Sequence, residues 1–212
     1  MKLRHLFYLL LAPIGIQAQS IGIDVGISNA NYQYRNSNGE KLNTLFGDSS
    51  TSIGIYTLIN LPSSDFFKIN VGLRYQGMDA YGYDVNVPLN YSTSYLSAMS
   101  ELESTLRTFY LNRYCSSCSG INLKTGVGLE FAKIIRGTQL VGDVQSFDLT
   151  LEDEFNGILF GPLVSASLEF DLLFEVKMAL KYTQTYFFNS HSSPERLRFN
   201  RGILSLGIIK EL

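Results

Sequence analysis

The chain has 212 residues, enough for one domain or at most two small ones, and carries 13 Tyr and 14 Phe but no Trp. Charged residues make up only 17% of it, whereas an average soluble domain has roughly 25%. The formal net charge of −2 excludes the basic footprint of a nucleic-acid-binding protein.

Residues 1–18 have the organisation of a secretory signal peptide. Lys2 and Arg4 form a basic start, an apolar segment follows, and cleavage is expected after Ala18. The apolar segment is interrupted and short for a bilayer span, which disfavours an uncleaved anchor. We expect residues 19–212 to form the exported domain.

Alternation of apolar and polar residues with a period of two recurs along the exported domain and predicts β-strands. The clearest example is Ile121–Phe131, INLKTGVGLEF, whose odd positions are mostly apolar and whose even positions are charged, polar or glycine. Eight such strands are expected, at residues 21–35, 52–61, 67–83, 105–115, 121–136, 158–170, 173–187 and 197–209.

The connections between these strands alternate in length. Long connections are expected at 36–50, 84–103 and 137–156, short ones at 62–66, 116–120 and 171–172, and one of medium length at 188–196. Long loops at one end, with short turns and both termini at the other, are typical of outer-membrane barrels. Within 84–103 and just beyond it, four residues are spaced for a short amphipathic helix: Leu96, Met99, Leu102 and Leu106.

Glycines and charged residues share one face of these strands. On a solvated face glycine weakens a strand, but inside a narrow barrel long charged side chains need small neighbours. We therefore expect the apolar face to meet lipid and the charges to fill the lumen as paired ions. The residues expected inside are Asp24, Lys68, Arg74, Lys124, Glu130, Glu169, Glu175, Lys177 and Lys181, and a rim girdle is expected from Tyr32, Tyr34, Tyr81, Tyr83, Tyr182 and Tyr186.

These features resemble the small outer-membrane β-barrel proteins of Bacteroidota-type bacteria, the PorT-like and OmpX-like group. The resemblance covers most of residues 19–212. It rests on the Gln17-Ala18-Gln19 leader end, on G-x-G segments such as Gly126-Val127-Gly128, and on the amphipathic final strand. The chain ends in Lys210-Glu211-Leu212, whereas barrels of this kind usually finish with an aromatic residue.

Three further features of the sequence are candidates for chemical sites. Cys115 and Cys118 form a C-x-x-C between two strands, where a local disulfide or inert thiols are favoured over a redox motif. His191 lies in a serine-rich loop, where a solvated histidine is favoured over a catalytic one. The acidic residues of 148–154 lack the ligand spacing of a calcium loop. No catalytic, metal or cofactor site is expected.

The sequence therefore predicts an all-β protein, an eight-stranded antiparallel up-and-down transmembrane β-barrel with a side-chain-filled lumen. We expect it in a bacterial outer membrane, in contact with lipid, with a non-enzymatic structural, adhesion or assembly role and with envelope protein partners bound through its external loops. The alternatives are a narrow transport pore, a lipid-modifying enzyme, and a soluble exported β-barrel or sandwich that binds a small apolar ligand.

Overall fold

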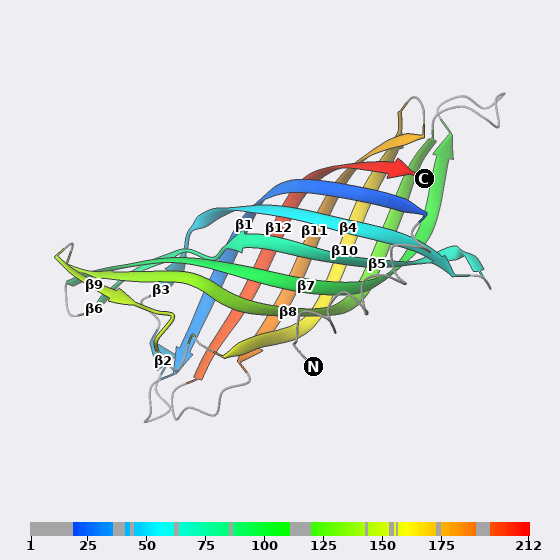
Figure 1. Ribbon diagram of the computed structural model, residues 1–212. Helices are drawn as coiled ribbons and strands as arrows, with labels where there is room; N and C mark the ends of the chain where they lie inside the picture. The colour runs from blue at the N-terminus through cyan, green and yellow to red at the C-terminus, as the bar shows by residue number, and fades with distance from the viewer. Residues whose placement is uncertain are drawn as a thin grey trace.

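A computed structural model describes residues 19–35, 41–42, 45–61, 64–84, 87–110, 120–142, 144–152, 155, 157–172, 175–189 and 196–212. Their strands form one antiparallel sheet that closes into a ring of 8 strands (Figure 1). Ring strands follow one another up and down, and the last pairs with the first. The ring consists of β1 (Ser20–Arg35), β4 (Ser49–Leu61), β5 (Ser64–Gly77), β7 (Val87–Tyr110), β8 (Gly120–Val141), β10 (Ile158–Asp171), β11 (Val176–Asn189) and β12 (Arg196–Glu211).

This ring confirms the predicted fold class. Among the described residues, no helix has the length and apolar character that crossing a membrane would need. Six predicted strands coincide with β1, β4, β8, β10, β11 and β12, with ends shifted by five residues or fewer.

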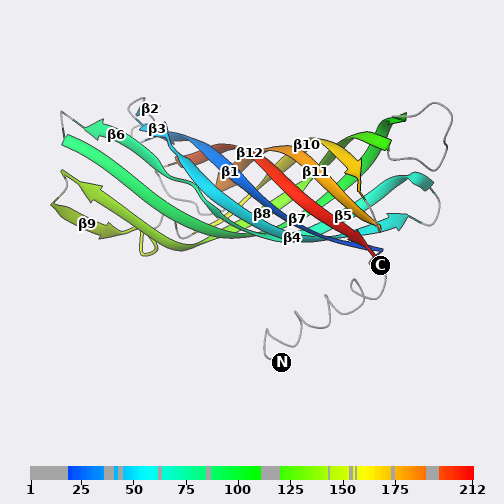
Figure 2. The same ribbon diagram turned by 90° about the horizontal axis from the view of Figure 1, so that it is seen from above.

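The strands are staggered around the ring. Following paired residues from Ile23 through each strand in turn leads back to β1 at Gln33, ten residues further along. Such a stagger makes the strands tilt across the barrel axis (Figure 2). Eight strands enclose an interior just wide enough for side chains to fill it.

Beyond the ring, the strands continue as a smaller sheet in the order β3-β6-β7-β8-β9. Its additional members are β3 (Leu45–Gly47), β6 (Ala80–Asp84) and β9 (Gln145–Asp148), while β2 (Lys41–Leu42) pairs with β1. This extension sheet lies at the end opposite the C-terminus, on the left of Figures 1 and 2.

The prediction for residues 84–103 was wrong. Residues 87–103 do not form a loop or a helix, because they belong to β7, which begins at Val87 and runs for 24 residues. The predicted strand at 105–115 is the last part of β7 as far as Tyr110, and its remaining residues lie outside the described part of the chain. β6 and β7 pair up to Asp84 and Val87, which leaves only residues 85–86 between them. The predicted strand 67–83 corresponds to β5 followed by β6, interrupted at Met78 and Asp79.

Candidate functional site

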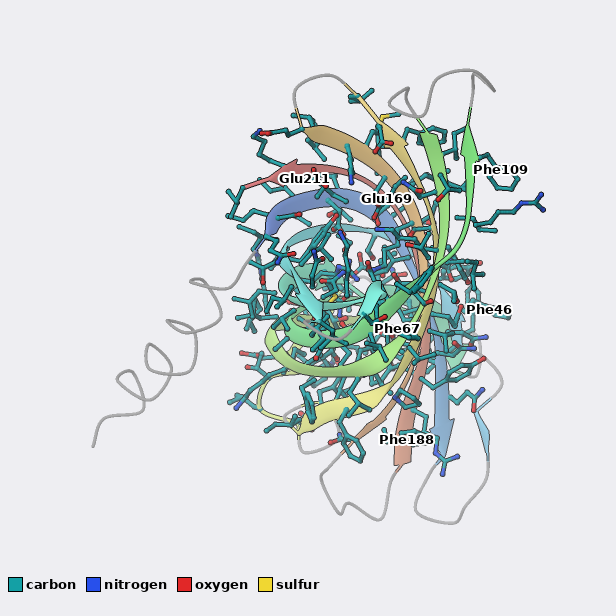
Figure 3. The ribbon with its side chains drawn as sticks, turned by 90° about the vertical axis from the view of Figure 1, so that its right-hand side faces the viewer. Phe46, Phe67, Phe109, Glu169, Phe188 and Glu211 are labelled. Atoms are coloured by element: carbon teal, nitrogen blue, oxygen red, sulfur yellow. The ribbon has the colours of Figure 1, made fainter. Side chains whose placement is uncertain are left out.

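The side chains of the ring strands separate into an apolar outer face and a polar inner face. On β8, the exposed fractions of Val127 and Phe131 are 58% and 51%, whereas those of Lys124 and Glu130 are 5% and 0%. This pattern confirms the faces predicted for Ile121–Phe131. Viewed from the end where the chain terminates, side chains occupy the interior of the ring, while Phe109 points away from it (Figure 3).

The centre of the lumen is held by an ion pair between β8 and β12. The guanidinium of Arg201 donates to both carboxylate oxygens of Glu130, at 2.8 and 2.6 Å, and both side chains are fully buried. Thr185 donates a third hydrogen bond to Glu130 at 3.0 Å, and Gln76 accepts one from Arg201. Such bidentate, charge-assisted contacts fix both partners firmly across the barrel.

A second group of charges lies on β7 and β11. The ammonium of Lys181 binds Glu101 and Glu103, each at 2.6 Å. Asn70 donates to Glu103 at 2.8 Å, and the hydroxyl of Ser165 donates to Glu101. One lysine thus neutralises part of the charge of two carboxylates.

Two further ion pairs complete the buried network. Arg74 donates to Asp24 at 2.9 Å, and Lys124 lies 2.6 Å from Glu169. Gly54 makes room for the first pair, because a Cβ there would lie 2.6 Å from Oδ1 of Asp24. Among the described residues, the buried charges are five acidic and four basic: Asp24, Glu101, Glu103, Glu130, Glu169, Arg74, Lys124, Lys181 and Arg201.

Most of the residues predicted to face the lumen do so. Glu175 is the exception: it lies in the turn before β11, exposed, and pairs with Lys210 at 2.7 Å. Lys68 and Lys177 are half-buried, and Lys177 binds Glu211 at 2.6 Å. The prediction missed Glu101, Glu103 and Arg201. Period-two counting back from Ser205 would have placed Arg201 inside, whereas Glu101 and Glu103 lay in a segment that was predicted to be a connection.

The half of the lumen nearest the extension sheet is filled by apolar and aromatic side chains. Leu149 and Phe155, which follow β9, are buried in this cluster with Tyr32. The rings of Tyr32 and Phe199 meet edge to face with centroids 4.6 Å apart. The other members are Ala30, Met78, Ala80, Tyr95, Ala132, Ile134, Leu159 and Phe187.

The burial of Tyr32 corrects the predicted rim girdle. Its side chain is only 4% exposed, and its hydroxyl donates to the backbone carbonyl of Met78. Side chains alternate between the two faces of β1, so Tyr32 points into the lumen like Ala30 two residues earlier. A position near the end of the strand therefore does not by itself place a tyrosine on the outer face. The side chain of Tyr34 lies outside the described set, and the remaining four are exposed: Tyr81, Tyr83, Tyr182 and Tyr186.

Most of the candidate chemical residues lie outside the described part of the chain. Cys115, Cys118 and His191 lie outside them. At the start of the acidic segment, Thr150 donates its hydroxyl and its backbone N–H to Asp148 at 2.7 and 2.9 Å, and these bonds lower the pKa of that carboxyl. In the described part of the chain, no three His, Cys, Asp or Glu side chains cluster as metal ligands would.

The outer face of the extension sheet carries a groove of about 280 Å³. Asp48, Asp79, Tyr81 and Asn90 contribute to its walls. Phe46 stacks on Tyr81 nearby, with ring centroids 5.6 Å apart. The groove is therefore a depression with a mixed apolar and polar lining and an aromatic border, outside the lumen.

Comparison with known proteins identifies the fold. No protein-family model matches the chain, and no curated protein matches it. Among solved structures, the outer membrane protein OprG from Pseudomonas aeruginosa is similar over 92% of this chain and 98% of its own, with a TM-score of 0.52 and 12% identity. The fold is that of a small outer-membrane β-barrel. At this identity, the likeness extends to the fold alone.

Two other structures are similar at lower TM-scores. The outer membrane protein AlkL has a TM-score of 0.45 and 13% identity and matches 92% of each chain. Neisserial surface protein A has a TM-score of 0.44 and 13% identity, and the match covers 91% of this chain and 97% of that one.

Proposed function

We propose that this protein resides in a bacterial outer membrane as a closed, non-enzymatic barrel that presents its extension sheet outside the cell. The observation that carries the proposal is the combination of an apolar outer face with a lumen filled along its length. The leader at residues 1–18 and the fold of OprG, itself an outer membrane protein, support this location.

A closed lumen favours a structural, adhesion or assembly role and disfavours transport through a pore. The Glu130–Arg201 pair and the Lys181 group cross the middle of the barrel, and the cluster around Tyr32 fills the next layer. An ion passing through would have to break buried pairs, each costing several kcal/mol once separated.

The extension sheet offers the surface for partners. Its exposed apolar side chains include Phe46, Val144, Phe147 and Leu151, the last two residues lying on or after β9. Exposed apolar groups gathered beside a groove are typical of protein-binding surfaces. We also propose that envelope protein partners bind through residues 36–50 and 137–156. We further propose that the protein belongs to the PorT-like and OmpX-like group.

Envelope fractionation with a heat-modifiability gel tests the location. We expect the protein in the outer-membrane fraction, with a mobility shift on boiling. Recovery in the periplasmic supernatant without a shift would show a soluble barrel instead.

Planar-bilayer recording tests the closed lumen, with a general porin as the positive control. We expect no stepwise conductance from the purified protein. Regular ohmic steps would establish the narrow pore. Release or transfer of acyl chains by the purified protein, abolished by His191→Ala, would establish the lipid-modifying enzyme.

A further inference from the structure

The outer face of β11, β12 and β1 changes from apolar to amide-rich part-way along the barrel. The change occurs immediately beyond Tyr182, Leu204 and Ile27, which pair side by side. The next outward positions form three paired rows, which we call the amide patch: Gln184, Gly202 and Asn29; Tyr186, Asn200 and Asn31; Phe188, Arg198 and Gln33.

The amide patch begins where other strands are still apolar. On β10 the outward apolar series runs from Phe170 to Ile158, about 28 Å along the membrane normal at roughly 3.3 Å per residue and a 45° tilt. On β1 the series runs only from Ile21 to Ile27, about 14 Å by the same reckoning. The apolar band of such barrels is about 25 Å tall, so the first row lies at the depth of the upper acyl chains and headgroups.

Polar side chains at that depth need partners, because hydrocarbon offers none. Tyr182 donates to the side-chain oxygen of Gln184 at 2.5 Å, and Gln184 donates to Asn200. Asn29, Asn31 and Gln33 are exposed to the surroundings of the barrel. The patch therefore presents amide hydrogen-bond donors and acceptors on the outer surface of the barrel, where molecules of the outer leaflet can bind them.

A positive charge borders these amides. The guanidinium of Arg198 lies over the ring of Phe188, 5.6 Å from its centroid, and the residue is exposed. Guanidinium groups match phosphate oxygens in geometry and charge. Amides beside an arginine are the chemistry that recognises a phosphorylated sugar.

The size of the patch favours a small headgroup over a protein as the bound partner. With rows about 7 Å apart and strands about 4.8 Å apart, it covers about 14 by 10 Å, which is large enough for a disaccharide with a phosphate group. A stable protein interface buries about 800 Å² on each partner, several times more than this patch provides. A small headgroup fits where a protein would not.

We propose that the amide patch binds the phosphorylated disaccharide headgroup of an outer-leaflet glycolipid. Arg198 binds the phosphate, Asn31 and Asn200 bind sugar hydroxyls, and the acyl chains lie along Ile27 and Leu204 below. The patch is continuous with the lipid-facing surface, so headgroup and chains of one molecule are held together. This inference rests on the outer-membrane location proposed above.

Binding of lipid A to the full-length protein in detergent micelles tests the inference, with phosphatidylglycerol as the comparison lipid. We expect lipid A to bind at least tenfold more tightly than phosphatidylglycerol. The double variant Arg198→Leu/Asn200→Leu should lose at least tenfold in affinity. Lys133→Leu, which removes an outward charge on β8, should bind like the wild type.

Equal affinity for the two lipids, or undiminished lipid A binding by the double variant, would overturn the inference. So would a loss of the same size in Lys133→Leu. If the double variant does not fold, Asn31→Leu replaces it, because this exposed residue takes no part in the buried ion pairs. A heat-modifiable protein without lipid A preference refutes the glycolipid site alone, whereas a soluble, unshifted protein refutes the proposed location.

Discussion

The substitution Glu130→Gln tests whether the buried ion pairs hold the barrel together. It keeps the size and shape of the side chain but removes the charge that faces Arg201. Both side chains have 0% exposure, so Arg201 would be left charged and without its counter-ion inside the lumen. Breaking a buried pair by removing one partner costs about 3–5 kcal/mol, which is the loss of unfolding free energy that we expect.

The pair between Glu175 and Lys210 provides the matched control. Its side chains are 71% and 50% exposed, and exposed ion pairs contribute about 0–1 kcal/mol. Glu175→Gln should therefore unfold almost like the wild type.

Equilibrium unfolding in urea, in lipid vesicles, measures both variants. Because the chain has no tryptophan, far-ultraviolet circular dichroism and gel mobility without boiling supply the signals. A loss below about 1 kcal/mol in Glu130→Gln, or a loss equal to that of Glu175→Gln, would refute the structural role of the pair. The double variant Glu130→Gln/Arg201→Gln should recover part of the stability, because no unpaired charge remains.

Three further substitutions test the two faces. Val127→Arg places a charge on the lipid face and should cost about 2–4 kcal/mol and reduce the heat-modifiable fraction; normal insertion would contradict an outward position. Gly126→Phe should lower the urea midpoint, because a side chain there meets the carboxylate of Glu101; an unchanged midpoint would show spare room in the lumen. Gly161→Ala should cost about 1–3 kcal/mol, because its Cβ meets the backbone carbonyl of Tyr186; a neutral result would contradict the close approach of β10 and β11.

The sequence predicts the faces of this barrel well because strand alternation is a local property. On β8 and β10 large apolar residues alternate with charged residues, serine and glycine, so the contrast between the two faces is strong. Burial of one face then makes the register unambiguous.

β7 was harder to recognise because its alternation has low contrast. Outward Ala98 and Ser100 are small, while inward Met99 is apolar, so no two-residue pattern stands out. Pairing with β5 and β8 along most of its length overrides the chance helical spacing of its leucines.

Pairing across the lumen lies beyond the reach of local patterns. Arg201 lies 125 positions from Gln76 and 71 positions from Glu130 in the sequence. Closure of the ring brings the three side chains together. Tyr32 joins the aromatic cluster for the same reason, since its neighbours come from several distant strands.

The pairing of β12 with β1 closes the ring and also determines the charge balance of its inner face. Sixteen residue pairs join the two ends of the chain, from Ser20 with Glu211 to Arg35 with Arg196. Until they form, the sheet is an open ribbon with free edges and an inner face whose Glu130 carboxylate has no guanidinium beside it. Because β12 supplies Arg201, closure of the ring by β12 and β1 also brings the guanidinium to the Glu130 carboxylate. Ring closure and neutralisation of this buried charge are therefore one structural event.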